Sequence, residues 1–124
     1  FLILVFKNHE YISPYFIVML LWYPAFETFF SIIRKLKLKI SPIGADNSHF
    51  HHLLYFFVQK RFNFKKNFSN NFSSFLIAGY NFLIFNISIL NISDSIFQIS
   101  LIFTNIIVYL FLYLKLKKFK IINA

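Results

Sequence analysis

The sequence predicts an all-α fold, a multi-pass transmembrane bundle with about three spanning helices of about 20 residues each. The chain has 124 residues, of which 58% are hydrophobic, yet 13 Lys and Arg against 4 Asp and Glu give a formal charge of +9. A soluble domain of this size cannot bury so much apolar side chain, and a disordered chain would not contain it. The charge is therefore expected to lie in aqueous segments between apolar spans.

Apolar runs of sufficient length to cross a bilayer cover 14–33, 72–92 and 96–114. A crossing needs about 20 helical residues. The second and third runs contain no charged side chain, and their amides are tolerable where they find hydrogen-bond partners on neighbouring helices. These amides are Asn81, Asn86, Asn91, Gln98 and Asn105.

The segment 1–13 begins with the apolar run 1–6 and ends in a short polar loop. The run has neither the basic flank nor the small-residue cleavage site of a signal peptide. We expect it to be the end of a truncated upstream span, and the chain to be the C-terminal fragment of a larger protein.

Positive charge lies on one side of the predicted spans. Segment 34–71 holds eight Lys and Arg and the tail 115–124 holds four, whereas segment 1–13 holds only Lys7 and the link 93–95 holds none. The positive-inside rule therefore predicts that 34–71 and 115–124 are cytoplasmic. This topology explains the charge without a nucleic-acid partner. The absence of Cys excludes disulfides and thiolate chemistry.

Glu27 is an ionisable residue in the predicted cytoplasmic half of the first span. Such a group costs several kcal/mol unless it faces protein, water or a partner. At 100° per residue, Glu27, Ser31 and Arg34 share one helix face. Glu27 either pairs with a basic group on a neighbouring helix or has a direct functional role, and the sequence leaves both open.

The start of the basic segment alternates Lys and apolar residues, a pattern that can rest on anionic headgroups. These residues are Lys35, Lys37 and Lys39 between Leu36, Leu38 and Ile40. Ser41-Pro42-Ile43-Gly44 then interrupts any helix. The apolar run 53–58 resumes a helical pattern, and Asp46 or Ser48 is expected to cap this helix.

His49, His51 and His52 form a cluster three residues after Asp46. The cluster can be a metal site, a phosphate site built from imidazoles and a helix N-terminus, or a polar loop in which histidines occur by chance. His49 and His52 are expected to share a helix face, with His51 elsewhere. Zinc is the weaker functional interpretation, because adjacent residues on one turn rarely supply three inward-facing ligands.

Taken in order, these elements resemble the C-terminal part of the polyprenyl-phosphate N-acetylhexosamine-1-phosphate transferases, also called glycosyl transferase family 4. The resemblance rests on P-x-x-E-T, a basic cluster, S-P, and D-x-x-H-x-H-H. These correspond to Pro24, Glu27 and Thr28, then to Ser41 and Pro42, then to Asp46, His49, His51 and His52. The two later spans and the basic tail also resemble the end of that fold.

The resemblance implies a multi-pass enzyme of the bacterial cytoplasmic (inner) membrane. Such enzymes transfer N-acetylhexosamine-1-phosphate from a UDP-linked sugar to a polyprenyl phosphate, such as undecaprenyl phosphate, and release UMP. They require Mg²⁺, and their products enter cell-wall, lipopolysaccharide and related polymer synthesis.

The resemblance also implies roles for individual residues. The nucleotide donor would contact His49, His51 and His52, with Arg34 and Asp46 in the same site and with Glu27 and Lys35 supporting it. The aspartates that bind Mg²⁺ or act as base in this family lie upstream, so no catalytic residue or metal ligand is assigned here. The fragment alone is expected to be inactive.

Two other classes of function remain open. The chain could be a small membrane scaffold or subunit whose basic loop binds anionic lipid or an acidic partner. It could also be a metal-transport or metal-sensing membrane protein that uses its histidines.

Overall fold

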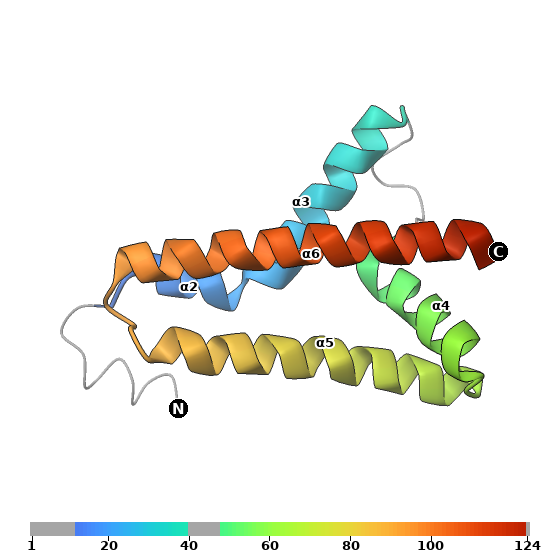
Figure 1. The fold of residues 1–124 in the computed structure, drawn as a ribbon. Helices are drawn as coiled ribbons and strands as arrows, with labels where there is room; N and C mark the ends of the chain where they lie inside the picture. Colours follow the sequence, from blue (N-terminus) through green and yellow to red (C-terminus); the bar gives the residue numbers. More distant parts are fainter. Residues whose placement is uncertain (1–11, 40–47, 124) are drawn as a thin grey trace.

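The computed structural model describes residues 12–39 and 48–123, and every regular element in these ranges is a helix (Figure 1). The all-α prediction is confirmed. Of segment 1–13 only residues 12 and 13 are described, so the prediction of a truncated upstream span lies outside the described residues. Asp46 also lies outside them. In chain order the helices are α2 (Pro14–Leu20), α3 (Trp22–Lys37), α4 (Phe50–Phe62), α5 (Lys66–Ile89) and α6 (Ser95–Asn123).

α5 and α6 form a long antiparallel hairpin, and each is long and apolar enough to cross a membrane (Figure 1). Both exceed the predicted spans, since α5 begins at Lys66 rather than 72 and α6 continues to Asn123 rather than 114. The sequence after Gly79 contains no Gly or Pro. Lys is also a good helix former, so nothing ends α6 at the first basic residue of the tail.

The first predicted span is broken. α2 and α3 meet at Leu21 with a bend of 69°, and only the two together are long and apolar enough to span. Pro24 lies in the first turn of α3. Its ring lacks an N–H and would clash with the carbonyl of Leu20 in a continuous helix, so the α2 hydrogen bonds stop there.

The predicted loop 34–71 is mostly helical. α3 extends to Lys37, α4 covers Phe50–Phe62, and α5 begins at Lys66. The helix expected over 53–58 is thus confirmed and is longer than the apolar run. It ends at Asn63, whose left-handed φ of 53° is a common way to terminate a helix.

The hairpin between α5 and α6 is held by Gln98, which is fully buried. Its Oε1 accepts a hydrogen bond from the Ser88 hydroxyl at 2.5 Å, and its Nε2 donates to the carbonyls of Ser88 and Asn91 at 2.9 and 3.0 Å. At the same end, the Ser13 amide donates to the Ile92 carbonyl at 3.1 Å. The Gln98 side chain therefore supplies hydrogen bonds to two backbone carbonyls where the chain reverses between α5 and α6.

Three of the other amides divide into two groups. Asn105 is buried and accepts a hydrogen bond from the Tyr80 hydroxyl at 2.5 Å, which joins α6 to α5 as predicted. Asn81 and Asn86 instead donate to carbonyls four residues earlier in their own helix. The predicted hydrogen bond to a neighbouring helix is therefore present for Asn105, whereas Asn81 and Asn86 bond within their own helix.

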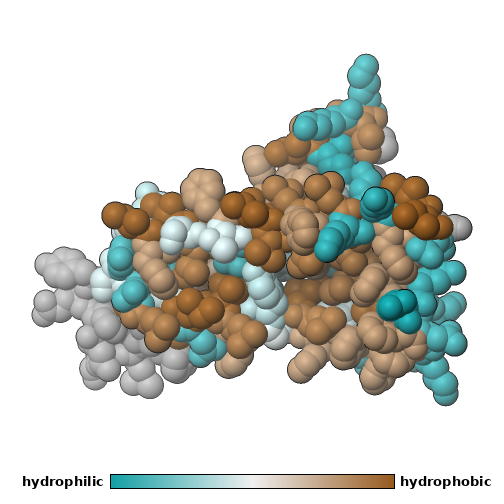
Figure 2. Space-filling view, viewed as in Figure 1, coloured by the Kyte–Doolittle hydropathy of each residue, from teal (hydrophilic) through white to brown (hydrophobic). Residues whose placement is uncertain are grey.

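The buried core lies where α2, α3, α4 and α6 meet, and it is rich in aromatic rings. Its members are Met19, Trp22, Phe50, Leu53, Tyr109, Tyr113 and Leu116. Apolar side chains also cover the outside, including Phe75, Phe82 and Ile107, each at least 65% exposed. Figure 2 shows this apolar middle, with hydrophilic residues gathered where α4 turns into α5, where α6 ends, and along α3. Such an exterior suits lipid or further membrane helices better than water.

Candidate functional site

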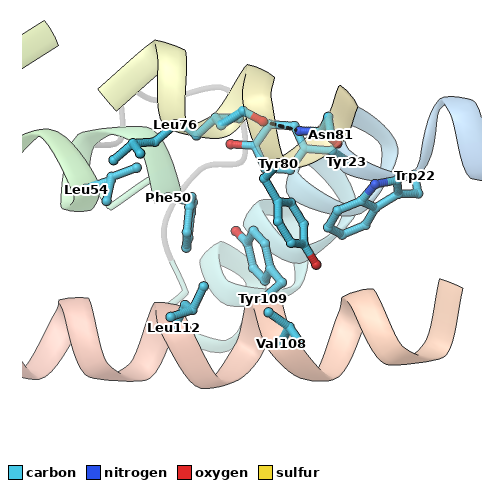
Figure 3. Close-up of a pocket in the computed structure, with 11 residues that line it drawn as sticks. Trp22, Tyr23, Phe50, Leu54, Leu76, Tyr80, Asn81, Val108, Tyr109 and Leu112 are labelled. Carbon is cyan, nitrogen blue, oxygen red and sulfur yellow. Dashed lines mark hydrogen bonds between the residues drawn. The ribbon is translucent and has the colours of Figure 1, made fainter. Parts of the chain in front are cut away.

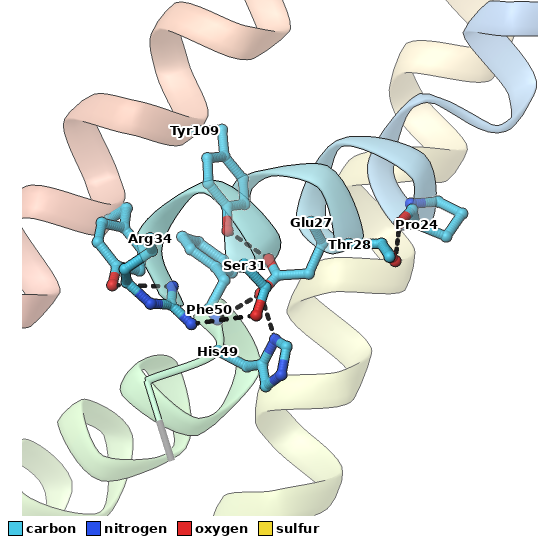
Figure 4. Close-up of polar contacts among 9 residues, drawn as sticks. Pro24, Glu27, Thr28, Ser31, Arg34, His49, Phe50 and Tyr109 are labelled. Carbon is cyan, nitrogen blue, oxygen red and sulfur yellow. Dashed lines mark hydrogen bonds and ion pairs between the residues drawn. The ribbon is translucent and has the colours of Figure 1, made fainter. Parts of the chain in front are cut away.

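Glu27 on α3 is the centre of the candidate site (Figure 4). Its Oε1 accepts a hydrogen bond from His49 Nδ1 at 2.9 Å and from the Phe50 backbone amide at 3.0 Å. Its Oε2 accepts one from the Tyr109 hydroxyl. One buried carboxylate thus connects α3, the beginning of α4, and α6.

These contacts explain how the interior tolerates Glu27. A buried carboxylate is costly unless donors satisfy its oxygens. Here three donors do so, and they come from an imidazole, a backbone amide and a phenol. Of the two alternatives for Glu27, pairing with a basic group of a neighbouring helix agrees with the His49 contact at the start of α4, and a direct functional role stays a prediction.

The α4 N-terminus differs from the expectation. His49 occupies the N-cap position but makes no side-chain cap bond, and the Phe50 amide donates to Glu27 instead. Asp46, one of the two expected caps, lies outside the described residues, and Ser48 stands one position before the N-cap. The helix end expected to receive a phosphate therefore has a carboxylate of this chain at its first amide.

Arg34 lies on the predicted face of α3 with Glu27 and Ser31, so the shared face is confirmed. The Arg34 Nη1 donates to the Tyr113 hydroxyl at 3.1 Å, and Nη2 donates to the Ser31 hydroxyl at 3.3 Å. The guanidinium also lies 5.7 and 5.6 Å from the ring centres of Phe30 and Tyr113, within cation–π range. The Arg34 guanidinium therefore lies against Tyr113 of α6. Lys35, on the next position, is also buried.

The three histidines lie together, but their pairing differs from the helical expectation. The ring centres of His49 and His51 are 5.9 Å apart, and those of His51 and His52 are 4.1 Å apart. His49 precedes the helix with an extended backbone, so it does not follow the helical register that would pair it with His52. His49 is partly buried, whereas His51 and His52 are exposed.

The surroundings of His51 lower its pKa from the usual value of 6.5. Although the side chain is exposed, the loss of part of its surrounding water is the largest cause of the lowered pKa. The neighbouring His52 and His49 act in the same direction, while Glu27 opposes them. His51 is therefore held in its neutral form to lower pH than a free imidazole. An anion bound beside it would favour the protonated form.

Among residues 12–39 and 48–123, no group of three His, Asp or Glu side chains is arranged to hold a metal ion. Mg²⁺ prefers carboxylate and phosphate oxygens, and both oxygens of Glu27 already accept hydrogen bonds. The described residues do not fit a Mg²⁺ site, so no step is assigned to the metal within them. The zinc interpretation likewise lacks a ligand set in this part of the chain.

An apolar cavity of about 210 Å³ adjoins the Glu27 contacts (Figure 3). Phe50 and Tyr109 form part of its wall, together with Trp22 and Tyr80. A larger groove of about 580 Å³ lies between α4 and α6, where Lys115 and Lys118 are the charged members of an otherwise apolar lining. Apolar cavity walls therefore adjoin the polar site where it faces α5 and α6.

Sequence reasoning missed Tyr109, whose hydroxyl completes the Glu27 contacts. A signal was present in the last span, since Gln98, Asn105, Tyr109 and Tyr113 recur at helical spacing and all are buried. A stripe of hydrogen-bonding side chains on a membrane helix marks the face that packs against other helices.

Comparison of the chain with protein-family models, with curated proteins and with solved structures found no match. The grounds for a function are therefore the motifs themselves and the contacts that join them.

Proposed function

We propose that this chain is the C-terminal part of a polyprenyl-phosphate N-acetylhexosamine-1-phosphate transferase of the bacterial cytoplasmic membrane. The enzyme transfers N-acetylhexosamine-1-phosphate from a UDP-linked sugar to polyprenyl phosphate and releases UMP, in the synthesis of a cell-envelope polysaccharide. The observation that carries the proposal is the contact between Glu27 and His49. These residues belong to separate motifs 22 positions apart, and they meet directly.

The placement of charge supports a site at a membrane surface. Phe57 of α4 packs against Phe119 of α6 with ring centres 5.0 Å apart. The α4–α5 turn and the basic end of α6 lie at the same end of the hairpin (Figure 1). The Ser13–Ser95 contact lies at the other end of the hairpin. A lipid phosphate and a soluble nucleotide can meet only at such an interface, and cationic side chains attract both.

The histidines are the groups proposed to contact the diphosphate of the donor. Protonated imidazoles donate charge-assisted hydrogen bonds to phosphate oxygens. His51 and His52 are exposed beside His49, so a soluble ligand can reach them. As charge develops on the departing UMP phosphate, donors fixed in place stabilise it without further reorganisation. The Mg²⁺ ligands and the base are proposed to lie elsewhere in the complete protein.

The test uses the complete protein in membranes with UDP-N-acetylhexosamine, undecaprenyl phosphate and Mg²⁺, and measures UMP release. We expect His49→Ala and His52→Ala each to lower the rate about 100-fold or more, because each removes a donor to developing charge. Membrane insertion should be unchanged. His9→Ala is the matched control, since His9 lies outside both motifs. Wild-type rates in both cluster variants would exclude the proposed role.

A further inference from the structure

The Glu27–His49 contact decides which nitrogen of the His49 ring is available for chemistry. Nδ1 lies 2.9 Å from Oε1 of Glu27, and a carboxylate can only accept, so Nδ1 carries the hydrogen. The other nitrogen, Nε2, lies on the side of the ring away from Glu27 (Figure 4). Any proton that His49 gains or loses is then gained or lost at Nε2.

We propose that Glu27 is a positioning residue that fixes His49 in its Nδ1–H tautomer and presents Nε2 to the donor's diphosphate, while Tyr109 orients the Glu27 carboxylate. This inference rests on the proposed function for the identity of the ligand. Protonated at Nε2, His49 donates to a phosphate oxygen while Glu27 balances the imidazolium charge. Without Glu27, the neutral ring would revert toward the Nε2–H tautomer, which histidine favours in water.

Tyr109 extends this arrangement to α6. Its hydroxyl donates to Oε2, so Oε1 faces His49 and the Phe50 amide. The ring is packed independently of its hydroxyl, with centres 5.0 Å from both Phe26 and Phe50. Tyr109→Phe therefore removes one hydrogen bond and leaves the packing in place. The carboxylate would gain freedom to rotate.

Glu27 also caps α4, so a purely structural role has to be separated from a role in setting the tautomer. Glu27→Gln keeps the size of the side chain and an oxygen for the Phe50 amide, but its NH₂ can donate to a ring nitrogen and so permits either tautomer. Glu27→Asp keeps the carboxylate on a shorter stem. If Glu27 serves only as a cap of α4, His49 should have the same tautomer in Glu27→Gln and in the wild type.

The experiment is ¹⁵N NMR of the complete protein with labelled histidine at about pH 8.5, above the usual imidazole pKa of about 6.5. Subtraction of the His49→Ala spectrum identifies the His49 signals. We expect the Nδ1–H tautomer in the wild type and in Tyr109→Phe. Glu27→Gln should give a mixed or Nε2–H population, and Glu27→Asp should largely restore Nδ1–H. An Nε2–H tautomer in the wild type, or no change in Glu27→Gln, would overturn the proposal.

Kinetics on the same samples separate this inference from the proposed function. We expect Glu27→Gln to lower kcat for UMP release about 10-fold to 100-fold, by analogy with the loss of residues that orient metal-binding histidines. Tyr109→Phe should have a smaller effect. If the tautomer shifts as described but His49→Ala keeps full activity, the positioning stands and the proposed function fails. If His49 is essential but Glu27→Gln keeps the wild-type tautomer and rate, the positioning role of Glu27 is excluded and the proposed function stands.

Discussion

The buried polar side chains of the described residues each have hydrogen-bond partners. In the part of the chain that the structure describes, no buried side-chain nitrogen or oxygen lacks a hydrogen-bond partner. Glu27 and Gln98 show the pattern most clearly, since each has three hydrogen bonds. An unmatched polar group in an apolar interior costs about 1–3 kcal/mol. The matching is therefore a condition for inserting these residues among apolar helices.

Gln98 provides a stability test at this scale. Gln98→Leu would remove the acceptor of the Ser88 hydroxyl and the side-chain donor to the Ser88 carbonyl, whereas the Asn91 carbonyl would keep the Asp94 amide as a donor. We expect a loss of about 1–3 kcal/mol in unfolding free energy, measured by denaturation in detergent micelles. Asn86→Leu is the control, because that exposed amide bonds only within its own helix. Equal stability of the two variants would contradict the role given to Gln98.

At the residue scale the sequence predicted the face shared by Glu27, Ser31 and Arg34, because helical periodicity alone determines it. It did not predict Tyr109, which lies 82 positions from Glu27 and meets it only through packing of α3 against α6. The cap of α4 was missed for the same reason. Its acceptor is 23 positions away, where no local capping pattern would place it.

Among the elements, the bent pair α2 and α3 departs most from the sequence prediction. The length and apolar composition of the run 14–33 predict one continuous span. The structure shows the bend of 69° that Pro24 permits. The bend directs α3 away from the α5–α6 hairpin (Figure 1).

Pro24→Ala tests the cause of this bend. The substitution restores an N–H and removes the clash, so α2 and α3 should approach one continuous helix. Spin labels on Tyr15→Cys and Leu36→Cys are suitable, because both positions are exposed and the chain has no Cys. We expect their separation to increase by several Å, toward the roughly 32 Å of a straight helix.

The control for that measurement is Pro14→Ala, because Pro14 occupies the first turn of α2, where Pro fits a helix. Its label separation should stay at the value of the parent protein. An unchanged separation in Pro24→Ala would show that tertiary packing, rather than the proline, maintains the bend.

For the whole molecule, the unusual combination of high charge and high hydropathy is explained by separation in space. Hydrophilic residues gather where α4 turns into α5, where α6 ends, and along α3, while apolar residues cover the middle (Figure 2). The sequence predicted this arrangement because charge and apolar runs alternate along the chain. It could not predict which segments pack, since the contacts of α4 with α6 depend on aromatic rings far apart in sequence.

Orientation in the membrane is testable because the chain has no Cys. We predict that Ser93→Cys reacts with a membrane-impermeant thiol reagent in spheroplasts, since the link 93–95 is expected to face outward. Lys65→Cys and Lys117→Cys should react only after permeabilisation, because the basic segments are expected to be cytoplasmic. All three positions are exposed. Labelling of Lys65→Cys in sealed spheroplasts would show that the orientation is opposite to the predicted one.

We propose that the Glu27 and His49 motifs form one site for transfer of a sugar phosphate to a lipid. UMP release from UDP-N-acetylhexosamine, dependent on polyprenyl phosphate and compared in His49→Ala and His9→Ala membranes, tests it most directly. We expect a rate about 100-fold or more below wild type in His49→Ala and an unchanged rate in His9→Ala. Equal, undiminished rates in the two variants, or no polyprenyl-dependent UMP release from the wild type, would contradict it.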